Sequence, residues 1–422
     1  MVFSYHLAFR SNLQNMIRNA TLSSLLLLTF SSANAQSDCG AGRYTDPLYF
    51  DSVSVLSGVV YGANNGVNGQ PQTLLLDVYQ PVGDTYQDRP VVIVAFGGSF
   101  IAGTRQDVAE LCLAFAHRGY VAIAPDYRVG FFFPTEATTT RAVVRSMHDL
   151  KACVRFLRKT VAEDGDPYGI DADRIIVGGV SAGAIGALHC TYLDQSSEIP
   201  PILFGDTATT GGVEGLSGSP GYSSDVLACY SMSGAIGDTT WFQAGDQPLC
   251  SIHEVQDGVV PYGTMEVSVV GIPTGLMASG SGDIHPRFDH LGIPNCFLSY
   301  PGNGHVGYLT SDPVNSVEFV AQFCASMVCG VTPTCGTLYV AVPENANPTL
   351  TAFPNPTTGQ VTVRLDEASN VSILAADGRC VKRLRLGAGA STIDLQDLPD
   401  GLYILRTEGD RPSVVRVVRS TE

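Results

Sequence analysis

A serine enclosed by small residues carries the clearest sign of chemistry in this sequence of 422 residues. Ser181 stands in the run Gly179-Val180-Ser181-Ala182-Gly183, between an apolar stretch at 174–178 and a helix-like stretch at 183–194. Such a run is common by chance, but a strand that turns sharply into a helix presents its serine hydroxyl for nucleophilic attack. The small flanking residues let the two backbones approach, and the helix N-terminus favours negative charge. We therefore predict that Ser181 is a nucleophile.

A serine nucleophile of this kind needs a carboxylate and a histidine, which follow it along the chain in that order. Asp257 comes just after a predicted strand at 249–254, and His305 comes just after another at 295–300. Because sites on open parallel sheets form at the carboxyl ends of strands, we expect both side chains to meet Ser181 there. Other nearby imidazoles and carboxylates fit these positions less well: His253, His285, His290, Asp238, Asp246, Glu254 and Asp283. We expect His253, at the end of its strand, to support the Asp257 loop.

Backbone N–H groups must surround the oxyanion that forms when such a serine attacks a carbonyl group. Ala182, directly after the nucleophile, is expected to supply one of them. The run Phe96-Gly97-Gly98-Ser99-Phe100 follows a predicted strand at 91–96, and Gly98 and Ser99 are the candidates for the other. A simple tight turn is the alternative interpretation of these glycines.

Aromatic side chains gather in loops that follow the same strand ends. Four of them are candidates for a substrate pocket: Phe131, Phe132, Trp241 and Tyr308. The alternative is that they are ordinary packing residues. The sequence has no His-Glu-x-x-His spacing, and His253-Glu254 is only an adjacent pair, so we expect neither a metal nor a cofactor.

Apolar runs alternate with amphipathic stretches from residue 73 to 328, which predicts an α/β domain with a mostly parallel sheet flanked by helices. Its strands are expected at 73–79, 91–96, 120–124, 174–178, 227–233, 249–254 and 295–300. Its helices are expected around the apolar stripe 143–157 and at 106–118, 183–194 and 313–327. Residues 200–225 are rich in Gly, Ser, Thr and Pro, which predicts a long surface loop or a lid. Alternating strands at 360–365, 371–374, 392–395, 402–405 and 414–418 predict a small all-β, sandwich-like domain at the end of the chain.

The charge of the chain is concentrated in its middle. The formal net charge is −16, and residues 36–350 alone carry 13 basic and 31 acidic side chains, a net of −18. Such a domain repels phosphate backbones and anionic membranes, so we do not expect a nucleic-acid partner.

The N-terminal residues predict export. Arg10 and Arg18 precede an apolar run at 22–30 and the A-x-A pattern at 33–35, so residues 1–35 have the organisation of a cleaved signal peptide. No later segment resembles a membrane span, so we expect none in the mature protein. Ten of the eleven cysteines lie before residue 350, and this even number is expected to form disulfides in an oxidising compartment. Free buried thiols are the alternative.

Residues 73–327 resemble the α/β-hydrolase carboxylesterases, including feruloyl- and acetylxylan-esterase-like members. The matching runs are 96–100, Ala124-Pro-Asp-Tyr-Arg128, Gly169-Ile-Asp-Ala-Asp-Arg-Ile175, 178–183, Asp257-Gly-Val-Val-Pro261 and Gly304-His305. The resemblance implies an acyl-enzyme on Ser181, with His305 as base and Asp257 orienting it. Relatives commonly begin the oxyanion run His-Gly-Gly-Gly where this chain has Phe96-Gly97-Gly98-Ser99, so the substrate is not fixed by the resemblance.

The end of the chain resembles the type A sorting domain of the type IX secretion system of Bacteroidota. The matching runs are Phe353-Pro-Asn-Pro-Thr-Thr-Gly359, Ala376-Asp-Gly-Arg379 and Leu398-Pro-Asp-Gly-Leu-Tyr-Ile-Leu405. The resemblance implies passage through that machinery, followed by release or attachment at the cell surface. A generic immunoglobulin-like accessory module is the alternative. The expected organisation is a signal peptide at 1–35, a catalytic domain at 36–330, a linker at 331–350 and a sorting domain at 351–422.

These predictions point to a secreted serine carboxylesterase that acts on acyl or aryl esters, such as those of plant polysaccharides. A polyesterase or a peptidase of the same fold uses the same three residues. A catalytically inactive surface adhesin is the alternative outside the enzymes.

Overall fold

The computed structural model describes residues 39–40, 42–206, 210–335, 350–365, 368–375, 379–407 and 414–421. Two compact units divide the chain between residues 337 and 338. The predicted signal peptide and most of the predicted linker lie outside the described residues. In the ranges that the structure describes, no helix has the length and apolarity needed to cross a bilayer.

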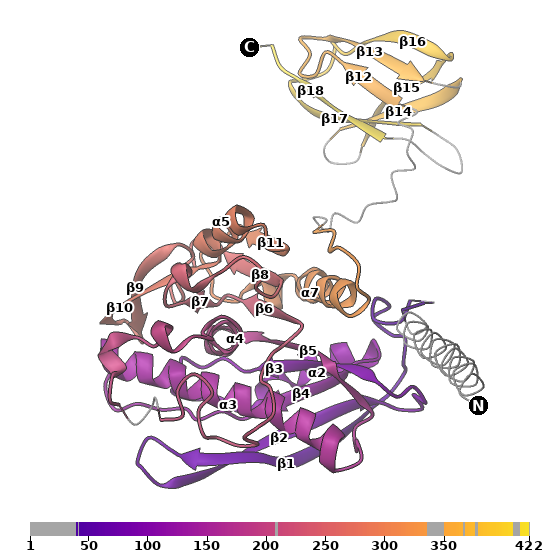
Figure 1. The fold of residues 1–422 in the computed structure, drawn as a ribbon. Helices are drawn as coiled ribbons and strands as arrows, with labels where there is room; N and C mark the ends of the chain where they lie inside the picture. The colour runs from indigo at the N-terminus through magenta and orange to yellow at the C-terminus, as the bar shows by residue number, and fades with distance from the viewer. Residues whose placement is uncertain are drawn as a thin grey trace, which may run out of the picture. The chain divides into compact units, whose positions relative to one another are not determined.

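The first unit is built on an eight-stranded sheet with the strand order β1-β2-β4-β3-β5-β6-β8-β11 (Figure 1). Pairing is antiparallel for β1, β2 and β4, and parallel from β4 through β11. The predicted, mostly parallel sheet is confirmed. The strands are β1 (Val53–Asn65), β2 (Pro71–Pro81), β3 (Arg89–Ala95), β4 (Val121–Pro125), β5 (Ile170–Val180), β6 (Ala228–Met232), β8 (Leu249–Glu254) and β11 (Asn295–Tyr300).

Burial explains which of these strands the sequence predicted. Val91, Val94 and Ala95 of β3 have no exposed surface, as expected for a strand covered on both faces. β1 was not predicted, because it lies at the edge of the sheet and most of its side chains are exposed or only half-buried. A further sheet of three short strands, β7 (Ala235–Ile236), β10 (Ile272–Gly280) and β9 (Thr264–Val269), was also not predicted.

The helices pack in two groups. α3 and α4 contact each other, and α2 contacts α7. The predicted helix at 106–118 is divided into a 3₁₀ turn and α2, and the helix around 143–157 extends in both directions as α3. The elements are α2 (Ala109–His117), α3 (Glu136–Glu163), α4 (Ala182–Tyr192), α5 (Ser281–Leu291), α6 (Tyr308–Ser311) and α7 (Pro313–Val328), with 3₁₀ turns η1 (Arg105–Val108), η2 (Ser196–Glu198), η3 (Pro201–Leu203) and η5 (Thr239–Trp241).

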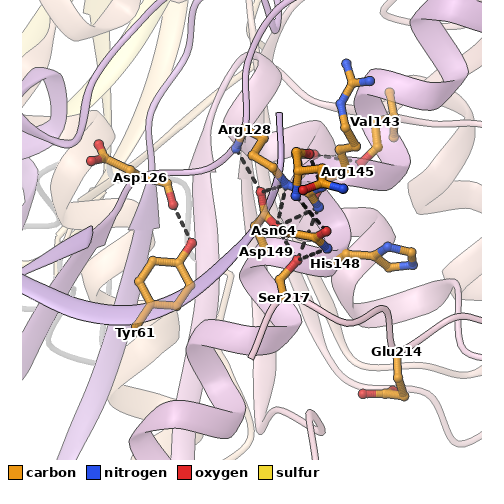
Figure 2. Close-up of polar contacts among 12 residues, drawn as sticks. Tyr61, Asn64, Asp126, Arg128, Val143, Arg145, His148, Asp149, Glu214 and Ser217 are labelled. Carbon is orange, nitrogen blue, oxygen red and sulfur yellow. Dashed lines mark hydrogen bonds and ion pairs between the residues drawn. The ribbon is translucent and has the colours of Figure 1, made fainter. Parts of the chain in front are cut away.

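A buried polar network fixes part of the loop that was expected to be a surface loop or lid. Figure 2 shows Arg128 and Ser217 converging on Asp149 of α3. The Arg128 guanidinium donates to Asp149 Oδ1 at 2.8 Å, and the Ser217 hydroxyl donates to the same oxygen at 2.6 Å. Asp149 and Ser217 have no exposed surface. The loop around Ser217 is therefore anchored inside the unit, whereas most of the other described residues of 200–225 are exposed or half-buried, as in a surface loop.

The cysteines form fewer disulfides than an even set allows. The structure contains Cys39–Cys329 and Cys296–Cys335. The prediction of disulfide bonds is confirmed, but only four of the ten cysteines before residue 350 form them. The other six cysteines before residue 350 are free and buried: Cys112, Cys153, Cys190, Cys229, Cys250 and Cys324. A free thiol is readily buried because it packs as a small apolar side chain.

The second unit is all-β, as predicted. A three-stranded sheet, β12-β13-β16, and a four-stranded sheet, β15-β14-β17-β18, enclose a core that includes Val361, Ile373 and Leu405. The strands are β12 (Leu350–Phe353), β13 (Gln360–Leu365), β14 (Ser369–Ala375), β15 (Cys380–Leu386), β16 (Gly389–Asp394), β17 (Gly401–Thr407) and β18 (Val414–Arg419). β12 and β15 were not among the predicted strands.

Candidate active site

Ser181 lies at the turn between a strand and a helix. β5 ends at Val180, α4 begins at Ala182, and the serine between them has φ 54° and ψ −121°. Its N–H donates to the carbonyl oxygen of Met232 at 2.8 Å. A left-handed φ is costly for a residue with a side chain and persists only where the surroundings impose it, often at functional sites. The turn expected from the sequence is present.

The two glycines beside the serine are required by backbone contact. A Cβ atom on Gly183 would lie 2.2 Å from the carbonyl oxygen of Ala95, and one on Gly179 would lie 2.5 Å from that same oxygen. Both values are far inside van der Waals contact. The close approach of β3, β5 and α4 therefore needs glycine at both positions.

The three residues predicted to form a triad lie in one hydrogen-bonded chain. His305 Nε2 is 2.7 Å from Ser181 Oγ, and His305 Nδ1 is 2.7 Å from Asp257 Oδ2. The Asp257 side chain is fully buried, whereas 18% of the His305 side chain remains exposed. With Asp257 ionised, Nδ1 carries the proton and Nε2 is free to accept the serine hydroxyl hydrogen.

The surroundings of Asp257 keep it ionised. Burial raises the pKa of this carboxyl, but hydrogen bonds from His253 and His305 and from two backbone N–H groups outweigh burial and lower the pKa. The N–H groups are those of Val259 and Val260, at 2.8 Å and 3.0 Å from Oδ1. An ionised carboxylate at this place stabilises a protonated His305.

His253 makes a direct contact with Asp257 in addition to packing beside its loop. Its Nε2 lies 3.4 Å from Asp257 Oδ2 and 3.3 Å from the carbonyl oxygen of Val260, so this nitrogen carries a proton. Its Nδ1 accepts from the Ser281 hydroxyl at 3.0 Å. Ser281 begins α5 and was not singled out in the sequence, where it lies among ordinary loop residues.

Glu254 holds the loop that carries His305. It is 5% exposed, and its Oε2 accepts the N–H of Gly307 at 3.3 Å. A Cβ on Gly304 would lie 2.6 Å from Glu254 Oε1, so the loop passes directly over this carboxylate. Glu254 therefore supports the position of His305, while Asp257 contacts the imidazole.

The glycine-rich loop after β3 lies against the nucleophile. A Cβ on Gly97 would be 3.2 Å from Ser181 Cβ, and Gly98 and Ser99 have φ values of 121° and 55°. The loop is held by the Tyr127 hydroxyl, which donates to the carbonyl oxygen of Phe96 at 2.6 Å. Among the hydrogen bonds of the described residues, none uses the N–H of Gly98, Ser99 or Ala182 as donor. These groups are available to an oxyanion.

A cavity of about 620 Å³ opens beside Ser181, and Ser99 and Ala182 also line it. Of the four aromatic candidates, only Trp241 lines this cavity. Phe131 and Phe132 line a separate depression of about 480 Å³ near the β1–β2 turn. Tyr308 is fully buried, and its hydroxyl is 3.0 Å from Ser233 Oγ. In the part of the chain that the structure describes, no three His, Cys, Asp or Glu side chains gather as a metal site would require.

Known family models match two separate parts of the chain. Residues 76–206 match the BD-FAE family model, and residues 351–418 match the model of the secretion system C-terminal sorting domain. Over residues 76–206 the chain is similar to the BD-FAE family. The resemblance to α/β-hydrolases of the esterase type and to a type IX sorting domain is thereby confirmed. The BD-FAE match includes Ser181 and the Gly98-Ser99 loop but ends before Asp257 and His305.

Two curated relatives each align with about a third of this chain. A probable isoprenylcysteine alpha-carbonyl methylesterase of Oryza sativa subsp. japonica is 34% identical over 150 residues, which are 36% of this chain and 31% of the relative. A non-reducing polyketide synthase of Emericella nidulans is 25% identical over 152 residues, which are 36% of this chain and 6% of the relative. The chain thus spans less than a third of the length of either relative.

Solved structures of esterase 2 from Thermogutta terrifontis are also similar. The propionate-bound form is 20% identical with a TM-score of 0.46, covering 67% of this chain and 96% of the esterase. The apo form is 20% identical with a TM-score of 0.45, covering 67% and 97%.

Proposed function

We propose that this protein is a serine carboxylesterase that forms an acyl-enzyme on Ser181. The observation that carries the proposal is the unbroken hydrogen-bonded chain from Ser181 through His305 to the buried Asp257. This chain of residues lies beside the N–H groups of Gly98, Ser99 and Ala182, which donate no hydrogen bond among the described residues, and beside an open cavity. The BD-FAE match of residues 76–206 supports the choice of esters as substrates.

The proposed reaction has two halves, acylation of Ser181 and hydrolysis of the acyl-enzyme. His305 Nε2 takes the proton of Ser181 as Oγ attacks the ester carbonyl carbon, and Asp257 stabilises the imidazolium that results. The N–H groups of Ser99 and Ala182, with Gly98, donate to the oxyanion. His305 then gives the proton to the leaving alcohol, and the acyl group stays on Oγ. A water molecule, deprotonated by His305, releases the acid in the second half.

The setting of this reaction is proposed to be outside the cell. The sorting-domain match at 351–418 supports export by the type IX secretion machinery, and the predicted signal peptide at 1–35 agrees with that route. The proposed substrates are therefore external esters, such as the acyl or aryl esters of plant polysaccharides. The protein acts there as a secreted or surface-attached enzyme.

A labelling experiment tests the proposal. The mature protein is incubated with a small fluorophosphonate probe and, separately, with short-chain nitrophenyl esters, alongside the Ser181→Ala variant. We expect the probe to label Ser181 and the variant to lose both labelling and hydrolysis. A Ser181→Ala protein that hydrolyses the esters at the normal rate, or a folded native protein that neither reacts with the probe nor hydrolyses esters, would refute the mechanism. The second result would favour an inactive adhesin.

A further inference from the structure

The cavity beside Ser181 extends along one face of α4. Besides Ser181, four residues of this helix and its C-terminal cap line the cavity: Ala182, Ile185, His189 and Leu193. Their spacing of three and four positions places them on one helix face. At a rise of 1.5 Å per residue, the face from Ala182 to Leu193 is roughly 16 Å long. The lining of the cavity therefore follows α4 from the nucleophile at its start to Leu193 at its end.

The other walls of the cavity are mainly apolar. α3 contributes Val143 and Val144, and the β9–β10 hairpin contributes Val267, Val269 and Leu276. Figure 1 shows this hairpin next to α3, and a Cβ on Gly275 at the hairpin would lie 3.9 Å from Glu136 Cβ, at the start of that helix. Elements far apart in the sequence thus enclose one space, and most of the surface that lines it is apolar.

The histidine in the cavity wall is uncharged. Burial lowers the pKa of His189 to about 4, although a hydrogen bond to the Ile185 carbonyl opposes this. The Nδ1 atom donates to that carbonyl at 2.8 Å, and Nε2 accepts the Gly237 N–H at 3.3 Å. Both ring nitrogens are therefore used by the protein, and the imidazole presents its ring to the cavity.

The charges that do line the cavity are negative. Glu198 accepts the N–H groups of Asp194 and Gln195, and Asp238 accepts the N–H of Thr240. Among the described residues that line the cavity there are these two carboxylates and neither lysine nor arginine. A substrate arm that carries its own carboxylate would lose its hydration without gaining a cationic partner. The cavity is suited to an uncharged arm.

We propose that this cavity binds a long, uncharged, apolar arm of the ester, which deepens the proposed function and rests on it. An extended chain advances about 1.2 Å per bond, so the face of α4 matches a linear chain of roughly twelve carbons. An acetyl group would leave nearly all of the cavity unfilled. Medium-chain and bulky aryl esters are therefore the substrate class, in preference to acetyl esters.

The expected discrimination follows from hydrocarbon burial. Each methylene removed from water favours binding by about fourfold, provided that the cavity accepts it in the transition state. Four added methylenes are then expected to raise kcat/KM by about a hundredfold, after losses from ordering the chain. The gain ends where the chain reaches Leu193.

A chain-length series tests the inference. The kcat/KM values of the full mature protein are measured on p-nitrophenyl acetate, butanoate, octanoate and dodecanoate, and on acetates of alcohols of the same lengths. We expect at least a hundredfold rise from the two-carbon to the eight-carbon member in one series. A rise in the first series assigns the acyl arm to the cavity, and a rise in the second assigns the alcohol arm. Equal rates throughout, or a preference for the shortest member in both series, would overturn the inference.

Two variants from different elements locate the effect. Ile185→Trp on α4 and Leu276→Trp on the hairpin place a large ring in the cavity, and each is expected to lower the ratio of octanoate to acetate rates at least tenfold. Val314→Trp is the control, because Val314 is 76% exposed and does not line the cavity. The inference would also be overturned if both cavity variants fold and are labelled at Ser181 but keep the native ratio of octanoate to acetate rates. Loss of Ser181 labelling in the native protein would instead refute the proposed function.

Discussion

His253 Nε2 lies 3.4 Å from Asp257 Oδ2, the same oxygen that His305 Nδ1 contacts at 2.7 Å. One carboxylate oxygen therefore faces two imidazoles, only one of which reaches Ser181. Because hydrogen bonds to the ionised form stabilise it, His253 helps to hold the pKa of Asp257 low. It also keeps the carboxylate oriented when His305 becomes positively charged.

We predict that His253→Ala lowers kcat/KM for a nitrophenyl ester by about tenfold or more, since a hydrogen bond to a charged group contributes 1.5–3 kcal/mol. The pH–rate profile should separate this effect from general damage. The acid limb of kcat/KM reports protonation of the base. Without His253 the Asp257 carboxylate faces one imidazole alone and stabilises its protonated form more strongly, so this limb should move to higher pH.

His253→Gln is the matched control, because its amide N–H replaces the Nε2 donor. It should recover part of the rate and return the acid limb toward its native position. If His253→Ala and His253→Gln have the same profile as the native protein, His253 is only a packing residue.

The sequence predicted the three catalytic candidates because each is marked by local pattern. Ser181, Asp257 and His305 each follow an apolar run of strand length, and parallel strands bring their carboxyl ends to one edge. The contact of His253 with Ser281 crosses 28 positions and depends on where α5 begins, which no local pattern records. The β9–β10 hairpin, whose residues line the cavity, was likewise not predicted from local pattern.

Local sequence pattern also could not predict which cysteines form disulfides or which aromatic side chains line the cavity. Cys229 and Cys324 lie on buried faces of β6 and α7, where composition alone does not distinguish a free thiol from half of a disulfide. Phe132 and Trp241 both follow strands, yet only Trp241 reaches the large cavity. Loop conformation decides these positions.

Replacing Gly183 by alanine should disrupt the serine turn. The new methyl group would meet the backbone carbonyl of Ala95, which cannot rotate away as a side chain does. We expect a loss of about 1–3 kcal/mol in unfolding free energy, typical of overpacking, together with loss of Ser181 labelling. Urea unfolding and fluorophosphonate labelling measure the two effects.

Gly186→Ala on the same helix is the control for this change. Its methyl group would lie 2.9 Å from the Ser146 hydroxyl oxygen, a side-chain atom that can move. Alanine also favours a helix by about 1 kcal/mol over glycine. A Gly186→Ala protein as damaged as Gly183→Ala would show that the backbone contact with Ala95 is not the cause.

Asp149→Ala should destabilise the first unit strongly. It leaves Arg128, a residue only 4% exposed, without the carboxylate that its guanidinium contacts, and it releases the Ser217 hydroxyl. Breaking a buried pair from one side costs about 3–5 kcal/mol. Urea unfolding with a tryptophan or circular-dichroism signal measures the change.

Asp171→Ala provides the comparison, since Asp171 pairs with Arg174 at 2.7 Å with 27% of its side chain exposed. Removing a partly exposed carboxylate should cost about 1 kcal/mol or less. Equal losses from Asp149→Ala and Asp171→Ala would contradict the view that burial makes the Arg128 pair indispensable.

Three buried histidines should make the first unit sensitive to mild acid. Burial lowers the pKa values of His148, His189 and His285 to about 4, from about 6.5 in the unfolded chain. Between these values the unfolded chain binds more protons than the folded one, so unfolding free energy falls as pH falls from 6.5 to 4. Each histidine contributes up to about 3 kcal/mol to this loss, which is complete below pH 4.

His285 allows a direct test of this pH dependence. Its ring stacks on Phe297 with centroids 4.5 Å apart, and its Nδ1 donates to Asn295 Oδ1 at 2.7 Å. His285→Phe keeps the stacking but cannot be protonated, so urea unfolding at pH 7, 6, 5 and 4 should show a shallower loss than in the native protein. His290→Phe, at an exposed position of the same helix, should leave the native slope. A His285→Phe slope equal to the native one would mean that His285 does not titrate between folded and unfolded states, and that acid sensitivity must come from the other two histidines or from carboxylates.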